Sequence, residues 1–361
     1  MHVLISLFSL IIISNAIKLS SIEKTYKKGI DAYSKERWSE CISKFEETLH
    51  LFKLYKTIEI NCRLKCESQK QKSEVEEIED IGIYKKFLNT RLCITKCQME
   101  GFDEARLNSF VPESIINEMT LKKPYEYLHI CYFQMNALPK AASAAYTYLV
   151  ANPNDEKMKQ NVQYYIDQPE VDINEVKDLE SEDYKILYNV GLKAYNAKKW
   201  GETAANMEES LTDYLSSENM CRADCQHQTE LEWSPEFTVT VSNYMTALLM
   251  CKQKCQDKLK YLNFNSGNEF LADLLNYLQI SYYHLGRIED AAKAVESYLL
   301  LLPNDEDILS NKNIYSSLTD QKNFVEKSDI AYYFKRDKYE KRVLDTFYNS
   351  DINNEINSMK E

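Results

Sequence analysis

Apolar residues recur every three or four positions over long stretches of this chain, which is the spacing of one face of an α-helix. One such series is Ala291, Val295, Tyr298 and Leu302. Pro303 follows it and cannot continue a helix, while Asn304 and Asp305 can cap the next one. The pattern therefore predicts one helix that ends near Leu302 and another that begins after Asp305.

The same pattern is present in two copies. The segments YKKGIDAY and SKFEETL at 26–33 and 43–49 match YNVGLKAY and ANMEESL at 188–195 and 205–211, and Trp38 matches Trp200, an offset of 162 (200 − 38). Residues 131–155 match residues 281–305, an offset of 150 (281 − 131). Each matched block resembles a tetratricopeptide repeat, which is a helix–turn–helix of about 34 residues. We expect four such repeats, two in each half.

These repeats predict an all-α chain, a duplicated α-solenoid in which disulfides staple helical hairpins. The expected order is a signal peptide at 1–16, a first half at 17–166, an acidic linker at 167–183, a second half at 184–318, and a C-terminal helix and tail at 319–361. The basic and then polar segment near 335–349 is a candidate partner-binding element.

The first residues predict secretion. Val3 to Ile13 is apolar except for Ser6 and Ser9, which suits the core of a signal peptide and is too short to span a bilayer. Small residues before Ala16 predict cleavage after that residue, although a short buried helix is the alternative. We expect the mature protein to enter the secretory pathway, and secretion to the extracellular matrix is one possible destination. The chain ends NSMKE, without a KDEL-type signal, so retention would require a partner.

Composition narrows the class of protein. Only 7 Gly and 7 Pro occur in 361 residues, which excludes a collagen-like chain and argues against a turn-rich β-sandwich. The net charge of −12 argues against general binding to nucleic acid or to anionic membranes.

Eight of the ten cysteines form four CxxxC pairs, two in each half. This spacing places both sulfurs of a pair on one helical face, so two antiparallel helices can be stapled twice. The favoured pairing is nested: Cys62–Cys97 with Cys66–Cys93, and Cys221–Cys255 with Cys225–Cys251. A four-thiolate zinc site in each half and a redox-active dithiol are the alternatives. Cys41 and Cys131 have no evident partner within the chain. We expect Cys41 to be a packed thiol, and an intermolecular bond is the alternative.

The duplicated CxxxC frame, together with the blocks at 125–153 and 270–305, resembles the leprecan family over roughly residues 20–345. Catalytic leprecans add an iron- and 2-oxoglutarate-dependent prolyl 3-hydroxylase domain, and in such domains His-x-Asp supplies two iron ligands. None of the five histidines here begins His-x-Asp or His-x-Glu. The chain also ends about where that domain would begin, so it resembles the non-catalytic members.

That resemblance implies an adaptor without cofactors in the lumen of the endoplasmic reticulum, whose partners are a collagen prolyl 3-hydroxylase, a cyclophilin B-type prolyl isomerase and procollagen chains. An adaptor for a lysyl hydroxylase and a secreted helical-repeat binding protein are alternatives, and a thiol oxidoreductase that uses the CxxxC pairs is the alternative enzyme.

No catalytic, cofactor-binding or metal-binding residues stand out, because Gly-rich phosphate loops and nucleophile motifs are missing from the sequence. The 26 tyrosines recur at matched positions, which favours core packing. Aromatic side chains also suit proline-rich ligands, so Tyr132, Tyr282 and Tyr283 are candidate partner contacts.

Overall fold

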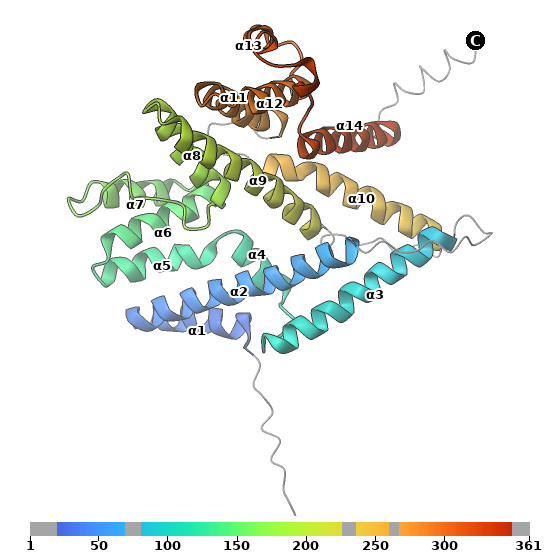
Figure 1. Ribbon diagram of the computed structural model, residues 1–361. Coiled ribbons are helices and arrows are strands. Elements are labelled where there is room, and N and C mark those ends of the chain that lie inside the picture. The colour runs from blue at the N-terminus through green and yellow to red at the C-terminus, as the bar shows by residue number, and fades with distance from the viewer. Residues whose placement is uncertain (1–19, 69–80, 226–235, 260–266, 349–361) are drawn as a thin grey trace, which may run out of the picture. The chain divides into compact units, whose positions relative to one another are not determined.

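The computed structural model describes residues 20–68, 81–225, 236–259 and 267–348, and these form fourteen α-helices and one 3-10 turn (Figure 1). The all-α prediction is confirmed, whereas the predicted signal peptide lies outside the described residues. The helices are α1 (Ile22–Ser34), α2 (Trp38–Glu67), α3 (Ile81–Glu104), α4 (Glu113–Thr120), α5 (Lys123–Gln134), α6 (Leu138–Ala151), α7 (Glu156–Ile166), α8 (Asp183–Asn196), α9 (Trp200–Asp224), α10 (Phe237–Lys258), α11 (Asn268–His284), α12 (Ile288–Leu301), α13 (Glu306–Ser316) and α14 (Ser328–Tyr348).

The chain divides into two compact units, Met1–Leu179 (unit 1) and Glu180–Glu361 (unit 2). In unit 1, α1 packs on α2 and α5 packs on α6; in unit 2, α8 packs on α9 and α11 packs on α12. Each unit has its own core of buried aromatic and aliphatic side chains. The internal duplication of the sequence is therefore also a duplication of packing.

Two matched glycines allow the first helices of each unit to approach closely. A Cβ added to Gly29 on α1 would lie 2.9 Å from the Phe45 ring on α2, and one added to Gly191 on α8 would lie 2.8 Å from Met207 on α9. Packing against the Phe45 ring therefore favours glycine at position 29. At position 191 the close atom is the terminal methyl of Met207, which belongs to a flexible side chain and can shift.

The predicted helix ends and caps are also present in both units. The helices α6 and α12 end just before the matched Pro153 and Pro303. The Asp155 side chain then accepts a hydrogen bond from the Met158 amide at 2.9 Å, and Asp305 accepts one from Ile308 at 3.1 Å. An N-cap carboxylate of this kind satisfies an amide that the helix itself leaves unpaired.

The CxxxC pairs join the two longest neighbouring helices of each unit. Between α2 and α3, Cys62 pairs with Cys97 (S–S 2.05 Å) and Cys66 with Cys93 (1.98 Å). Between α9 and α10, Cys221 pairs with Cys255 (2.08 Å) and Cys225 with Cys251 (2.17 Å). The pairing is nested, as predicted for antiparallel hairpins. Because all eight of these sulfurs are in disulfides, none is left as a thiolate ligand for the alternative zinc sites.

Cys41 and Cys131 also form a disulfide, with an S–S distance of 2.03 Å, and the expectation of a packed free thiol was wrong. The bond links α2 to α5, and neither cysteine is exposed. In unit 2 the matched positions hold Thr203 and Ser281, which are also fully buried. The same helix crossing is thus covalent in unit 1 and non-covalent in unit 2.

The segment expected to be an acidic linker is partly anchored on unit 1. The Leu179 amide donates to the Thr147 hydroxyl on α6 at 2.8 Å, and Val171 is buried. A similar bond precedes α14, where the Lys327 amide donates to Ser297 on α12 at 2.8 Å. Both connections are therefore fixed to the last hairpin of their unit.

Among the described helices, none is both long enough and apolar enough to cross a membrane.

We expect the Cys41→Thr/Cys131→Ser variant, which takes its residues from unit 2, to fold but to lose about 2–4 kcal/mol in free energy of unfolding. Loss of the cross-link increases the conformational entropy of the unfolded chain, which lowers the stability of the folded state. Urea unfolding without reductant measures the change. Cys41→Thr alone should expose one titratable thiol after denaturation, against none in the wild type. An unchanged unfolding midpoint in the double variant would contradict the prediction.

Candidate functional site

Two of the three tyrosines predicted as partner contacts are enclosed by their own unit. Tyr132 on α5 is 7% exposed, and Tyr282 on α11 is 2% exposed. The Tyr132 hydroxyl donates to Glu46 on α2 at 2.7 Å, and the Tyr282 hydroxyl donates to Glu208 on α9 at 2.6 Å. Burial, with help from these carboxylates, raises the pKa of both hydroxyls far above the ordinary value. Both tyrosines therefore serve packing between helices.

Tyr283 is the tyrosine of this set that a partner can reach, because its side chain is 41% exposed. Its ring stacks on Tyr315 of α13, with the ring centroids 5.5 Å apart. The neighbouring His284 stacks on Trp200 at 4.1 Å. Tyr283 is thus held by an aromatic neighbour while part of its surface stays accessible.

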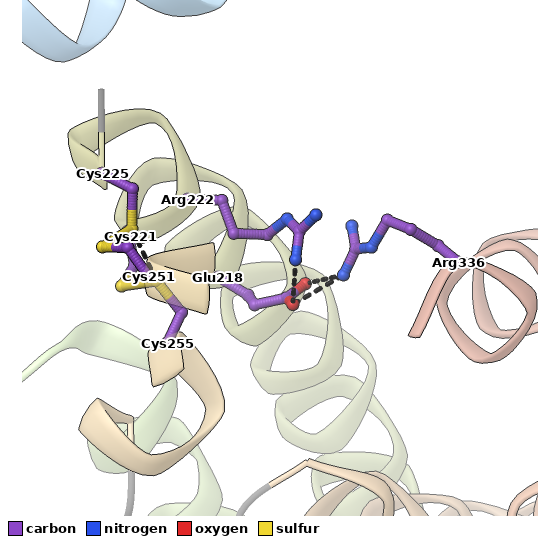
Figure 2. Close-up of a disulfide and its surroundings, with 7 residues drawn as sticks. All are labelled: Glu218, Cys221, Arg222, Cys225, Cys251, Cys255 and Arg336. Carbon is purple, nitrogen blue, oxygen red and sulfur yellow. Dashed lines mark hydrogen bonds and ion pairs between the residues drawn. A yellow bond between two sulfur atoms is a disulfide. The ribbon is translucent and has the colours of Figure 1, made fainter. Parts of the chain in front are cut away.

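A buried charged cluster joins α14 to α9 beside the disulfides of unit 2 (Figure 2). Glu218 on α9 is only 1% exposed, and Arg336 on α14 donates to its Oε1 at 2.6 Å. Arg222, one turn along α9, lies 3.9 Å from the same oxygen and also pairs with Glu340 of α14. Burial raises the pKa of Glu218, and the two guanidiniums oppose that rise. A buried carboxylate depends on such partners to stay charged.

Unit 1 contains a matching buried glutamate–arginine pair, which was not predicted from the sequence. Tyr55, Glu59, Cys62, Arg63 and Cys66 have the spacing of Tyr214, Glu218, Cys221, Arg222 and Cys225. Glu59 and Arg63 are 5% and 4% exposed, and they pair at 3.5 Å. The repeated spacing of a glutamate and an arginine around the cysteines was the signal that could have revealed these pairs.

The C-terminal helix is docked on its own unit. A stripe of Ile330, Tyr333 and Asp337 on α14 is buried. From α10, Gln256 donates to Asp337 at 2.7 Å and Gln253 donates to Glu340 at 2.7 Å. The sequence suggested this helix or the tail after it as a partner-binding element. The inner face of the helix is occupied by its own unit, and the tail lies outside the described residues.

A groove remains on the outside of this helix pair. Its α10 wall carries Met250, Gln253, Lys254, Gln256 and Asp257, and its α14 wall carries Lys341, Leu344 and Asp345. Side chains of both charges surround the apolar Met250 and Leu344. The groove shows how α10 and α14 lie against each other along this edge.

The described histidines occupy packed positions or the surface of single helices. His129 on α5 is 2% exposed, and its Nδ1 lies 3.0 Å from the Tyr165 hydroxyl of α7. Desolvation lowers the pKa of its imidazole to about 4. In unit 2, Gln279 takes this place and accepts a hydrogen bond from Tyr315. His129 is therefore a neutral core residue at neutral pH.

Among the residues that the structure describes, no three or more His, Cys, Asp or Glu side chains converge to hold a metal ion. All ten cysteines are paired in disulfides. The surface features described above are an exposed tyrosine and a groove.

A family model for the leprecan TPR-like repeat region matches residues 21–319. Cartilage-associated protein of mouse (Mus musculus) is 28% identical over 337 residues, which cover 91% of this chain and 84% of that protein. The human (Homo sapiens) protein of the same name is 29% identical over 302 residues, covering 82% of this chain and 75% of that protein.

Longer proteins match as well. Prolyl 3-hydroxylase 1 of chicken (Gallus gallus) is 27% identical over 345 residues, which cover 91% of this chain but only 46% of that protein. The chain therefore spans less than half the length of this hydroxylase.

We expect Arg336→Met to lower the free energy of unfolding by about 3–5 kcal/mol, because it leaves the buried Glu218 carboxylate without its closest cation. Arg342→Met, on the exposed side of the same helix, is the matched control and should change it by less than about 0.5 kcal/mol. Urea unfolding compares the two variants. Equal effects would show that the buried cluster does not hold α14.

His129 should make the protein sensitive to acid. The unfolded imidazole has a pKa near 6.5 and the folded one about 4, so the unfolded state takes up the proton first as the pH falls. Its contribution is intact above pH 6.5 and decreases until about pH 4. Between pH 7 and pH 5 we expect a loss of about 2 kcal/mol.

His129→Gln places the unit 2 residue in unit 1 and retains a hydrogen-bonding group for Tyr165. This variant should lose less stability than the wild type between pH 7 and pH 5, as measured by urea unfolding at each pH. Parallel pH profiles for the two proteins would exclude His129 as the cause.

Proposed function

Because the chain belongs to the leprecan family, we propose that it is a non-catalytic adaptor of collagen modification. Its partners in this proposal are a prolyl 3-hydroxylase, a cyclophilin B-type prolyl isomerase and procollagen chains. The proposed location is the lumen of the endoplasmic reticulum. The observation that carries the proposal is the repeat-region match over residues 21–319.

Similarity to the cartilage-associated proteins of mouse and human supports the adaptor proposal. The chain covers 84% and 75% of the mouse and human cartilage-associated proteins, but 46% of the chicken prolyl 3-hydroxylase. No histidine of the sequence begins His-x-Asp or His-x-Glu, the motif that would supply two ligands to a hydroxylase iron. What the relatives share with this chain is thus a helical-repeat region.

The fold suits this role because stacked helical hairpins present long helix faces to partners. Tyr283 is one proposed contact, since it is exposed and held in place by Tyr315. The disulfides give the chain a rigid frame in an oxidising compartment. They also weigh against the thiol oxidoreductase alternative, because Cys62, Cys66, Cys225 and Cys255 are buried in disulfides.

Affinity purification of the tagged chain from cells that make it tests the proposal. We expect a prolyl 3-hydroxylase and a cyclophilin to co-purify, and loss of the chain to lower 3-hydroxyproline in procollagen peptides measured by mass spectrometry. An unrelated disulfide-bonded secretory protein serves as the control bait. Recovery of a lysyl hydroxylase instead would favour the alternative complex, and recovery of no collagen-modifying enzyme would contradict the function.

A further inference from the structure

The outer face of α3 carries large apolar side chains that its own helix hairpin leaves exposed. Leu88, Leu92 and Met99 are 50%, 68% and 69% exposed. Their spacing places them on one side of the helix, together with the exposed Lys85 and Lys96. We call these five residues the α3 stripe. The cysteines that staple α3 to α2 lie on a different side.

The matching face in unit 2 borders the groove between α10 and α14. The groove residues Met250, Lys254 and Asp257 of α10 lie along the edge where α14 packs. Counted from the disulfide cysteines, with an offset of 158 (251 − 93), these positions correspond to Leu92, Lys96 and Met99 of α3.

The two faces differ in polarity in an informative way. The acidic Asp257 of α10 corresponds to the apolar Met99 of α3, and Gln253, which binds Glu340 of α14, corresponds to Thr95. The α3 stripe is thus more apolar than the matching α10 wall of the groove, where Lys254 and Asp257 are exposed. Exposed leucine and methionine in a row are typical of a surface that binds another protein.

Charge indicates the chemistry of the ligand. α3 contains Lys85, Lys86, Arg91 and Lys96 ahead of its acidic C-terminal residues Glu100, Asp103 and Glu104, although the whole chain has a net charge of −12. Lys96 lies 4.0 Å from Glu100 one turn further along the helix. Basic residues flanking an apolar stripe attract a segment with the opposite pattern.

We propose that the α3 stripe is a docking site for an acidic amphipathic helix of a partner protein, which lies along α3. This inference rests on the adaptor role proposed above, because it supplies the surface by which an adaptor would hold its partner. The apolar side of the incoming helix covers Leu88, Leu92 and Met99, and its carboxylates face Lys85 and Lys96.

A photo-crosslinking residue at position 92 of the full-length chain, expressed in the secretory pathway of its own cells, tests the site. Position 309 is the control, because Leu309 is also an exposed leucine on a helix, at 40%. Mass spectrometry should find position 92 joined to another protein, in a segment with net negative charge and apolar residues every three or four positions. Products no more abundant than at position 309 would overturn the proposal. So would crosslinks to unit 2, to a second copy of the chain, or to a basic or extended segment.

A synthetic peptide of the crosslinked segment then gives the affinity. Leu92→Glu should weaken its binding roughly tenfold or more, whereas Leu309→Glu should leave it unchanged. Equal affinity of the two variants would overturn the proposal. Thermal unfolding shows whether both variants fold, as expected for substitutions at exposed positions.

The two proposals can fail separately. If Leu92→Glu/Met99→Glu still co-purifies with the hydroxylase as the wild type does, the adaptor function stands and the α3 site is wrong. If position 92 crosslinks to an acidic helix but no collagen-modifying enzyme co-purifies with the wild type, the site stands and the adaptor function is wrong.

Discussion

The covalent tie between the long helices of each unit is the constraint on which the fold depends. Among the described side chains of α3, Ile94 and Phe102 are the buried ones, so little apolar surface holds this helix against α2. Two nested disulfides fix the hairpin instead, and the buried glutamate–arginine pair lies one turn from the cysteines in both units. Cross-links of this kind reduce the freedom of the unfolded chain and so compensate for a thin core.

Much of the architecture could be predicted because it follows from local spacing. Helical periodicity, the prolines after α6 and α12, and the Asp155 and Asp305 caps are local signals, and the nested cysteine pairs follow from two antiparallel helices. The Cys41–Cys131 bond could not be predicted in this way, because its cysteines lie 90 residues apart and unit 2 has no equivalent bond. The duplication pointed away from the bond by matching these positions to Thr203 and Ser281.

The candidate site was harder to predict because residue type does not reveal burial. Tyr132 and Tyr282 suit ligand contact by their chemistry, yet Glu46 and Glu208 hold their hydroxyls inside the units. The two units keep several contacts with different residues, such as His129 with Tyr165 and Gln279 with Tyr315. Packing thus restricts geometry more strongly than it restricts residue identity, and only the folded chain shows which side chains are free to meet a partner.

The five disulfides have a topological property of their own: no two of them cross when drawn along the chain. In unit 1, Cys66–Cys93 lies inside Cys62–Cys97, which lies inside Cys41–Cys131; in unit 2, Cys225–Cys251 lies inside Cys221–Cys255. With this connectivity, each disulfide loop can form around a loop that is already closed, and the chain does not have to thread through any loop. During synthesis from the N-terminus, unit 1 can therefore be oxidised completely before the first cysteine of unit 2 appears.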